Sequence, residues 1–109
     1  MDKPYVREYK KVKQFTIFLV DGEYIRNKID TAFVLAGHAL AFGYIPENEI
    51  WVEYRTEKHE IMFLAAHELF ENKLMTAGID YDSAHDLANI IEHACRKHHT
   101  KVKEILSLI

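Results

Sequence analysis

The longest apolar segment of the chain, Ile61–Met75, reads IMFLAAHELFENKLM. When these residues are placed on a helix at about 100° per residue, apolar side chains cover almost every side, and a helix of that kind is mostly buried. Thr56 is a residue type that caps the start of helices, and Gly78 is one that ends them. The pattern therefore predicts a long helix that the rest of the domain covers.

Three potential metal ligands interrupt this helix, namely His67, Glu68 and Glu71. His67 and Glu71 are four residues apart, so a helix projects both from the same face, one turn apart. Burying a carboxylate without a partner is costly, so the glutamates need a cation, a hydrogen-bond network or a solvent-filled cleft. A divalent metal in a cleft satisfies all three side chains at once. The alternative is an ordinary i, i+4 pair of His67 and Glu71 on the helix surface.

A second helix is expected to begin at Asp80 or Asp82 and to run to about His98. On it, His85 and Glu92 share one side, while the opposite side is apolar. If the two helices pack antiparallel, His85 approaches the second half of the first helix. We therefore predict His85 as a third metal ligand, with Glu92 as an alternative ligand or as a partner that orients His85. A capping or surface histidine is the simpler reading of His85.

Short β-branched and aromatic runs precede these helices. Asp21-Gly22 separates two such runs, which is a hairpin signal, and His38–Phe42 fits either a strand or a helical turn. The runs expected to form strands are Phe15–Val20, Glu23–Lys28, Glu49–Tyr54 and part of Thr31–Leu35.

Strands followed by helices indicate an α+β fold of two layers. We expect a small antiparallel sheet, made of the N-terminal hairpin plus an edge strand and packed on two to three C-terminal helices, the last over Lys101–Leu108. Residues 1–13 are polar and basic and are expected to form a flexible arm, which leaves residues 14–109 as a single domain.

Composition narrows the class of function. The chain has 109 residues and a formal net charge of -3, which argues against nucleic-acid binding although lysines and arginines gather near both ends. Cys95 is the only cysteine, so neither an internal disulfide nor a thiolate metal cluster is possible, as suits a reducing cytosol. No secretory signal or membrane span is apparent. A cytoplasmic location is therefore expected.

Two resemblances follow from the residues described above. The strand Glu49-Ile50-Trp51-Val52, followed by a helix with Ala66-His67-Glu68-Leu69, resembles the core of small zincin-type metallopeptidases, whose signature is H-E-x-x-H. The resemblance implies His67 as first ligand, Glu68 as general base and Glu71 in the place of the second ligand. It also implies an edge strand that can hold an extended peptide. The segment Asp21–Glu92 in addition resembles small bacterial and phage proteins of uncharacterised function that carry H-E-L-x-E.

Glu71 departs from the zincin signature. A carboxylate ligand adds negative charge, which makes water on the metal less acidic. The ligand set His67, Glu71 and His85 suits zinc but also iron(II) or manganese. With zinc, we expect a metal-dependent hydrolase, most simply a peptidase, in which Glu68 takes a proton from water and His38 or Tyr81 stabilises the oxyanion.

Two other functions compete with hydrolysis. The first is a non-catalytic module on a zincin-like fold that binds a protein partner, or a structural metal-binding protein, because the second histidine of the signature is missing. The second is a metal-dependent phosphohydrolase, in which His85-Asp86 is the metal-binding pair. Such domains are all-helical and need a further downstream aspartate, and none follows Asp86. The oligomeric state and the substrate are left open.

Overall fold

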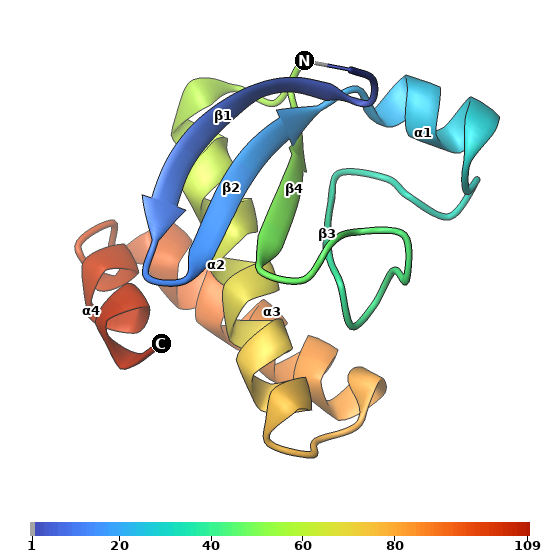
Figure 1. Cartoon of the computed structure of the whole chain (residues 1–109). Coiled ribbons are helices and arrows are strands. Elements are labelled where there is room, and N and C mark those ends of the chain that lie inside the picture. Colours follow the sequence, from blue (N-terminus) through green and yellow to red (C-terminus); the bar gives the residue numbers. More distant parts are fainter. Residues whose placement is uncertain (1) are drawn as a thin grey trace.

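The structure is a computed structural model that describes residues 2–109, and it has an α+β fold, as predicted (Figure 1). Four strands form one sheet in the order β1-β2-β4-β3. The strands are β1 (Tyr5–Val12), β2 (Phe15–Val20), β3 (Ala36–His38) and β4 (Glu49–Glu53). The helices are α1 (Gly22–Lys28), α2 (Lys58–Thr76), α3 (Tyr81–Lys97) and α4 (Lys101–Leu108). Among the helices of the described residues, none has both the length and the apolar character that a membrane span requires.

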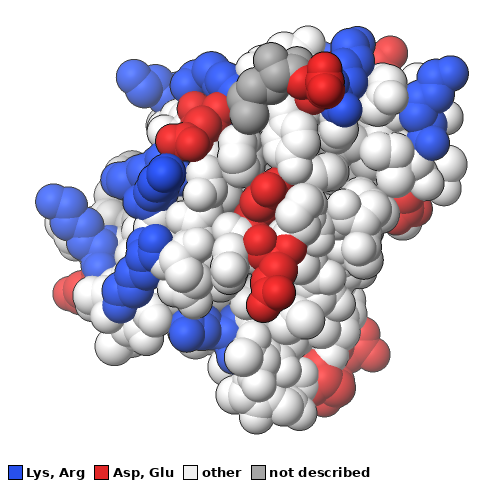
Figure 2. All heavy atoms as spheres, in the orientation of Figure 1, with Lys and Arg blue, Asp and Glu red and all other residues white. Residues whose placement is uncertain are grey.

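Strand β1 corrects the expectation of a flexible arm over residues 1–13. Tyr5–Val12 pairs antiparallel with β2, and Lys13 takes a φ of 54° in the short turn between the two strands. Val12 is buried, whereas the lysines and the arginine of β1 are exposed, which is the usual composition of an edge strand. On the face shown in Figure 2, basic side chains gather on the side of the molecule where β1 and α4 lie. The basic side chains that suggested an arm therefore belong to the solvent-exposed part of a strand.

Asp21-Gly22 begins a helix and does not form a hairpin turn. The Asp21 side chain accepts a hydrogen bond from the backbone N–H of Tyr24 at 3.1 Å, and α1 follows over Gly22–Lys28. The returning strand expected at Glu23–Lys28 is therefore wrong. Asp before Gly serves equally well as a helix N-cap, and local sequence does not separate the two uses.

The sheet is mixed, not wholly antiparallel as expected. The chain leaves β2, passes through α1 and β3, and returns as β4, which pairs in parallel with β2 over five residue pairs. β4 therefore lies between β2 and β3 and is not an edge strand. The expected strand within Thr31–Leu35 is also wrong, because the third strand begins at Ala36.

Each face of the sheet is covered by different elements. On one face the alternating residues Ile17 and Leu19 of β2 and Ile50 and Val52 of β4 pack against α2, which contributes Ile61, Ala65 and Leu69. On the other face Trp51 packs with the fully buried Phe33, which precedes β3, and with Ile45 of the loop between β3 and β4. Because both faces are covered, β4 is largely buried, and α2, which follows it and carries His67, Glu68 and Glu71, packs against one face of the sheet.

The expected end of α2 is confirmed and its expected start is not. Gly78, with a φ of 100°, lies just past the helix, and the N–H of Ile79 donates to the carbonyl of Leu74 at 3.0 Å. This is a Schellman ending, in which the left-handed position favours glycine. Thr56 does not cap α2, which begins at Lys58 without a side-chain cap. The Asp80 side chain caps α3 through the N–H of Ser83 at 3.1 Å, so α3 starts directly after the turn.

Candidate metal centre

Three histidines converge on the carboxylate of Glu71. His67 Nε2 lies 3.1 Å from Oε2 and His85 Nδ1 lies 2.9 Å from the same oxygen, while His38 Nε2 lies 2.8 Å from Oε1. Only 2% of Glu71 is exposed to solvent, and His38 is fully buried. Three buried polar side chains and the partly exposed His85 thus meet at the junction of α2, α3 and β3.

The helices bring the predicted ligands together as expected. His67 and Glu71 project from one side of α2, and His85 lies in the first turns of α3. The helices pack antiparallel, because His85 near the start of α3 meets the second half of α2, and Arg96 near the end of α3 meets Glu60 near the start of α2. The nitrogen and oxygen atoms of His67, Glu71 and His85 all lie within 4.8 Å of one another.

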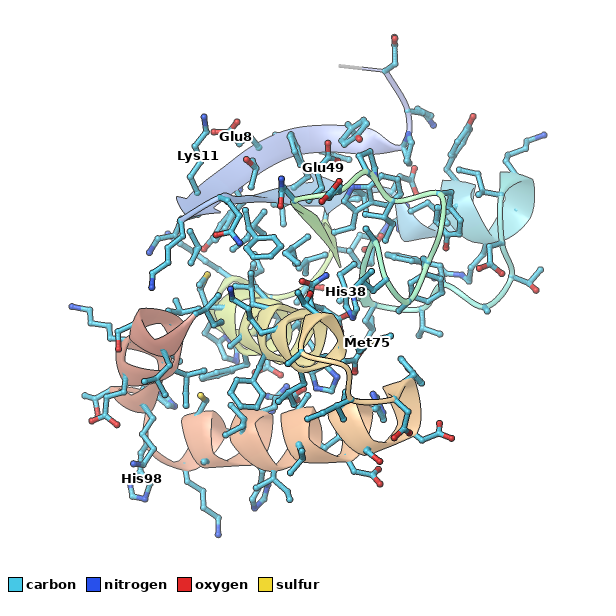
Figure 3. The ribbon with its side chains drawn as sticks, turned by 60° about the horizontal axis from the view of Figure 1, so that its bottom comes forward. Glu8, Lys11, His38, Glu49, Met75 and His98 are labelled. Atoms are coloured by element: carbon cyan, nitrogen blue, oxygen red, sulfur yellow. The ribbon has the colours of Figure 1, made fainter. Side chains whose placement is uncertain are left out.

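His38 reaches the centre from the sheet. It is the last residue of β3 and lies beside the second half of α2 (Figure 3). Gly37 before it has no room for a side chain, since a Cβ there would come within 2.6 Å of the Phe42 ring. The second ring nitrogen of His38, Nδ1, lies 3.2 Å from the side-chain amide nitrogen of Asn72. His38 was considered for oxyanion stabilisation, but it contacts Glu71 and Asn72 and does not line the cleft described below.

Glu68 lies beside this cluster, and its carboxylate has few polar contacts. Only 9% of the residue is exposed, and in the described part of the chain no group donates a hydrogen bond to its carboxylate. His67 Nε2 lies 3.8 Å from Oε2 of Glu68. Burial raises the pKa of Glu68 to about 8, and the carboxylates of Glu71 and Glu92 act in the same direction.

Glu71 has the opposite electrostatic character. Burial by itself would raise the pKa of its carboxyl, but hydrogen bonds from His38, His67 and His85 outweigh burial and hold that pKa well below its usual range. Burial would lower the pKa of His67, but its contacts with Glu71 and with the other nearby carboxylates raise it instead. Two carboxylates one turn apart thus differ sharply: Glu71 is ionised and Glu68 holds its proton more strongly.

A row of charged side chains lies on the side of His67 that faces away from Glu71. Glu92 Oε1 lies 3.0 Å from His67 Nδ1, the ring nitrogen that faces away from Glu71, which is the distance of an ion pair although Nδ1 makes no hydrogen bond among the described residues. Arg96 holds the other oxygen of Glu92 with two hydrogen bonds of 3.0 and 2.9 Å, and also bonds both oxygens of Glu60. Glu92 therefore lies beside His67, whereas the sequence predicted that it would orient His85. Arg96 and Glu60 were not identified from the sequence, because i, i+4 and cross-helix ion pairs are common on helix surfaces.

An open cleft reaches the cluster. Two adjoining hollows, of about 220 and 240 Å³, share Val34, Ala36, Glu68 and His85 in their walls. Tyr81 also lines the cleft and stacks on the ring of His85 at 5.5 Å between centroids. A larger cavity of about 480 Å³ lies near Asn72 and Lys73, but Glu47 is its only acidic residue and it has no histidine. The cleft over Glu68 and Glu71 is therefore the candidate site.

Comparison of the chain with protein-family models, with curated proteins and with solved structures found no match. The site is therefore interpreted from its own geometry.

The contacts that link Arg96 through Glu92 to His67 allow a first prediction. In Arg96→Met, Glu92 loses its partner and is free to turn away from His67 Nδ1, so the dissociation constant for zinc should rise about 10–100-fold. The measurement is a competition titration with a chromophoric chelator, together with thermal unfolding of the metal-free protein. Lys97→Met, which removes an exposed cation one residue along, is the control. Equal affinities in the two variants would show that Arg96 does not support the centre.

Glu68 allows a second prediction, on the pH dependence of stability in the absence of metal. Its pKa is raised from 4.5 to about 8 on folding, so the folded state binds the extra proton between these values. The stabilisation is complete below the unfolded pKa and is lost as the pH rises through about 8. The free energy of unfolding of chelator-treated protein should therefore fall with rising pH more steeply than that of Glu68→Gln. His67 and Glu71 are present in both proteins, so a parallel dependence of the two unfolding free energies on pH between pH 5 and 9, measured with urea, would contradict the prediction.

Proposed function

We propose that this chain is a metal-dependent hydrolase of the zincin type that acts on peptide bonds. In this proposal His67, Glu71 and His85 hold the metal, and Glu68 is the general base. Zinc is the first choice of metal, and iron(II) and manganese also suit two histidines and a carboxylate.

The observation that carries the proposal is the convergence of His67 and His85 on one oxygen of Glu71. Both ring nitrogens lie within 3.1 Å of that oxygen, which is buried at the floor of an open cleft, while His85 itself is partly exposed. Glu68 lies beside them, buried and without a hydrogen-bond donor in the described residues. The combined charge of two neighbouring carboxylates is costly in the interior, and a divalent cation is the partner that offsets both of them.

The ligand set fits a catalytic site better than a purely structural one. Two histidines and one carboxylate form a three-residue set that leaves a position for water, whereas structural zinc sites use four protein ligands, often cysteine. The second ring nitrogen of His67 lies 3.0 Å from Oε1 of Glu92 but makes no hydrogen bond among the described residues, and a carboxylate in this place is usual beside metal-bound histidines. Such a metal supplies Lewis acidity, which makes water more acidic and polarises a substrate carbonyl.

The residues around the ligands then have separate tasks. Glu68 lies on the cleft wall, and its pKa of about 8 is near neutrality, as suits a group that takes a proton from water and returns it to a leaving amine. Tyr81 lines the same cleft, so its hydroxyl is the nearest candidate for contact with the substrate carbonyl. An extended peptide fits beside Val34–Ala36, because β3 is the edge strand of the sheet and this segment borders the cleft.

The proposal is tested by metal content and hydrolysis together. Protein purified without chelator and reloaded with zinc, iron(II) or manganese should hold stoichiometric metal by inductively coupled plasma mass spectrometry, whereas His67→Ala and His85→Ala should each hold one equivalent less. His93→Ala, on the exposed side of α3, is the control. Cleavage of a peptide mixture, followed by mass spectrometry, should depend on the metal. Wild-type protein without stoichiometric metal under all three conditions would refute the proposal.

One observation favours a second function, that of a non-catalytic interaction module. The three histidines already satisfy Glu71 with hydrogen bonds, so Glu71 at least does not require a metal. This alternative predicts that a protein partner co-purifies with the chain and that Glu68→Gln leaves that association intact.

A further inference from the structure

The two oxygens of the Glu71 carboxylate face different partners. Oε2 is directed to His67 and His85, and Oε1 is directed to His38. A carboxylate in this position can bind one cation through each oxygen. The ligands of the proposed function occupy one side of Glu71 only.

A second set of ligand atoms lies on the Oε1 side. His38, Glu68 and Glu71 offer a ring nitrogen and two carboxylate oxygens that lie within 4.8 Å of one another, and all three residues are buried. This set shares only Glu71 with the set formed by His67, Glu71 and His85. Its independent support is Glu68, which is nine-tenths buried beside His67 and Glu71 and has no hydrogen-bond donor in the described residues.

We propose that the centre holds two divalent cations, bridged by Glu71. The first is bound by His67 and His85, and rests on the proposed function. The second is bound by His38 and Glu68. Cations that share a bridging carboxylate in two-metal sites lie roughly 3.5–4 Å apart. The second position has two carboxylates and one histidine, a ligand set richer in oxygen, so it favours manganese or iron(II) over zinc.

His38 is able to serve as a ligand because of Asn72. The side-chain amide of Asn72 faces His38 Nδ1, and an amide can either donate to that nitrogen or, rotated by half a turn, accept from it. In the rotated form the proton is on Nδ1, and the lone pair of Nε2 is directed at the side of Glu71. The same neighbour thus supports His38 both as a hydrogen-bond donor to Glu71 and as a metal ligand.

Charge sets the order of binding. One divalent cation balances Glu68 and Glu71, while a second leaves an excess of positive charge that only hydroxide or an anionic group of the substrate can offset. The two cations should therefore bind in two steps, the second more weakly. In the doubly loaded state Glu68 is a ligand, and its role as base belongs to the singly loaded state.

The test is a titration of metal-free protein with Mn²⁺, followed by metal content and by electron paramagnetic resonance. We expect two equivalents, and at the second equivalent the spectrum of isolated Mn²⁺ should give way to that of a spin-coupled pair. His38→Gln should hold one equivalent and show no coupled pair. His85→Ala should lose the tighter step. His98→Ala, at the exposed end of α3, should behave as wild type.

The outcomes separate the two proposals. One equivalent in the wild type, unchanged in His38→Gln, would overturn the second cation and leave the proposed function intact. No bound metal would overturn both. Two equivalents without spin coupling would place the ions apart and exclude a bridge through Glu71. The measurement on the wild type requires no substitution, so a failure of His38→Gln to fold would not remove the test.

Discussion

Glu71→Ala should abolish metal binding altogether. Glu71 is the one residue common to both groups of ligand atoms, and its two oxygens contact three histidines. Zinc at about 100 times its dissociation constant should stabilise the wild type by about 2.7 kcal/mol, since a ligand that binds only the folded state shifts the equilibrium by mass action. The variant should show no such gain in an unfolding titration with and without zinc.

The substitution also removes a shared hydrogen-bond acceptor. With Glu71 absent, three histidine nitrogens lose their partner, and an unsatisfied buried donor costs about 1–3 kcal/mol. Glu71→Gln keeps the volume and one acceptor oxygen and removes the charge, so it separates loss of folding from loss of metal. Glu104→Ala, on exposed α4, is the control. Metal content like that of the wild type in a folded Glu71 variant would show that the cluster is a hydrogen-bond network and not a metal centre.

Glu68→Gln should reduce the turnover number of peptide hydrolysis by about 10²–10⁴, the usual contribution of a general base. The amide keeps the size of the side chain and cannot take a proton, while the tighter metal equivalent should stay bound by His67, Glu71 and His85. The measurement is turnover at fixed metal content. Glu57→Gln, an exposed residue before α2, is the control. Unchanged hydrolysis in a folded, metal-loaded variant would exclude Glu68 from the chemistry.

The same variant distinguishes an enzyme from an interaction module. An interaction module should keep its protein partner in Glu68→Gln, because neither the volume nor the fold changes. The His38→Gln variant adds a second comparison. Turnover that survives there with one bound cation would identify Glu68 as a base, whereas loss of turnover would indicate that Glu68 acts together with the second cation.

Local sequence was sufficient for the three C-terminal helices and for part of the site, but not for α1. The apolar character of Ile61–Met75 predicted α2, and Gly78 predicted its end. The start of α3 was predicted at Asp80 or Asp82, and the structure has Asp80 as the cap. The four-residue spacing of His67 and Glu71 placed both on one side of α2. These predictions succeeded because helical periodicity and helix ends depend on residues within one or two turns of each other.

Tertiary structure alone decided the rest of the centre. His38 is 33 residues from Glu71 in sequence and reaches it only because β3 pairs with β4 above α2. The support that Glu60 and Arg96 give to His67 likewise joins residues 36 apart. The parallel pairing of β2 with β4 placed β3, and not β4, at the edge beside the cleft. Such contacts arise from burying both faces of the sheet at once, a condition that acts on the whole chain and leaves no mark in the spacing of neighbouring residues.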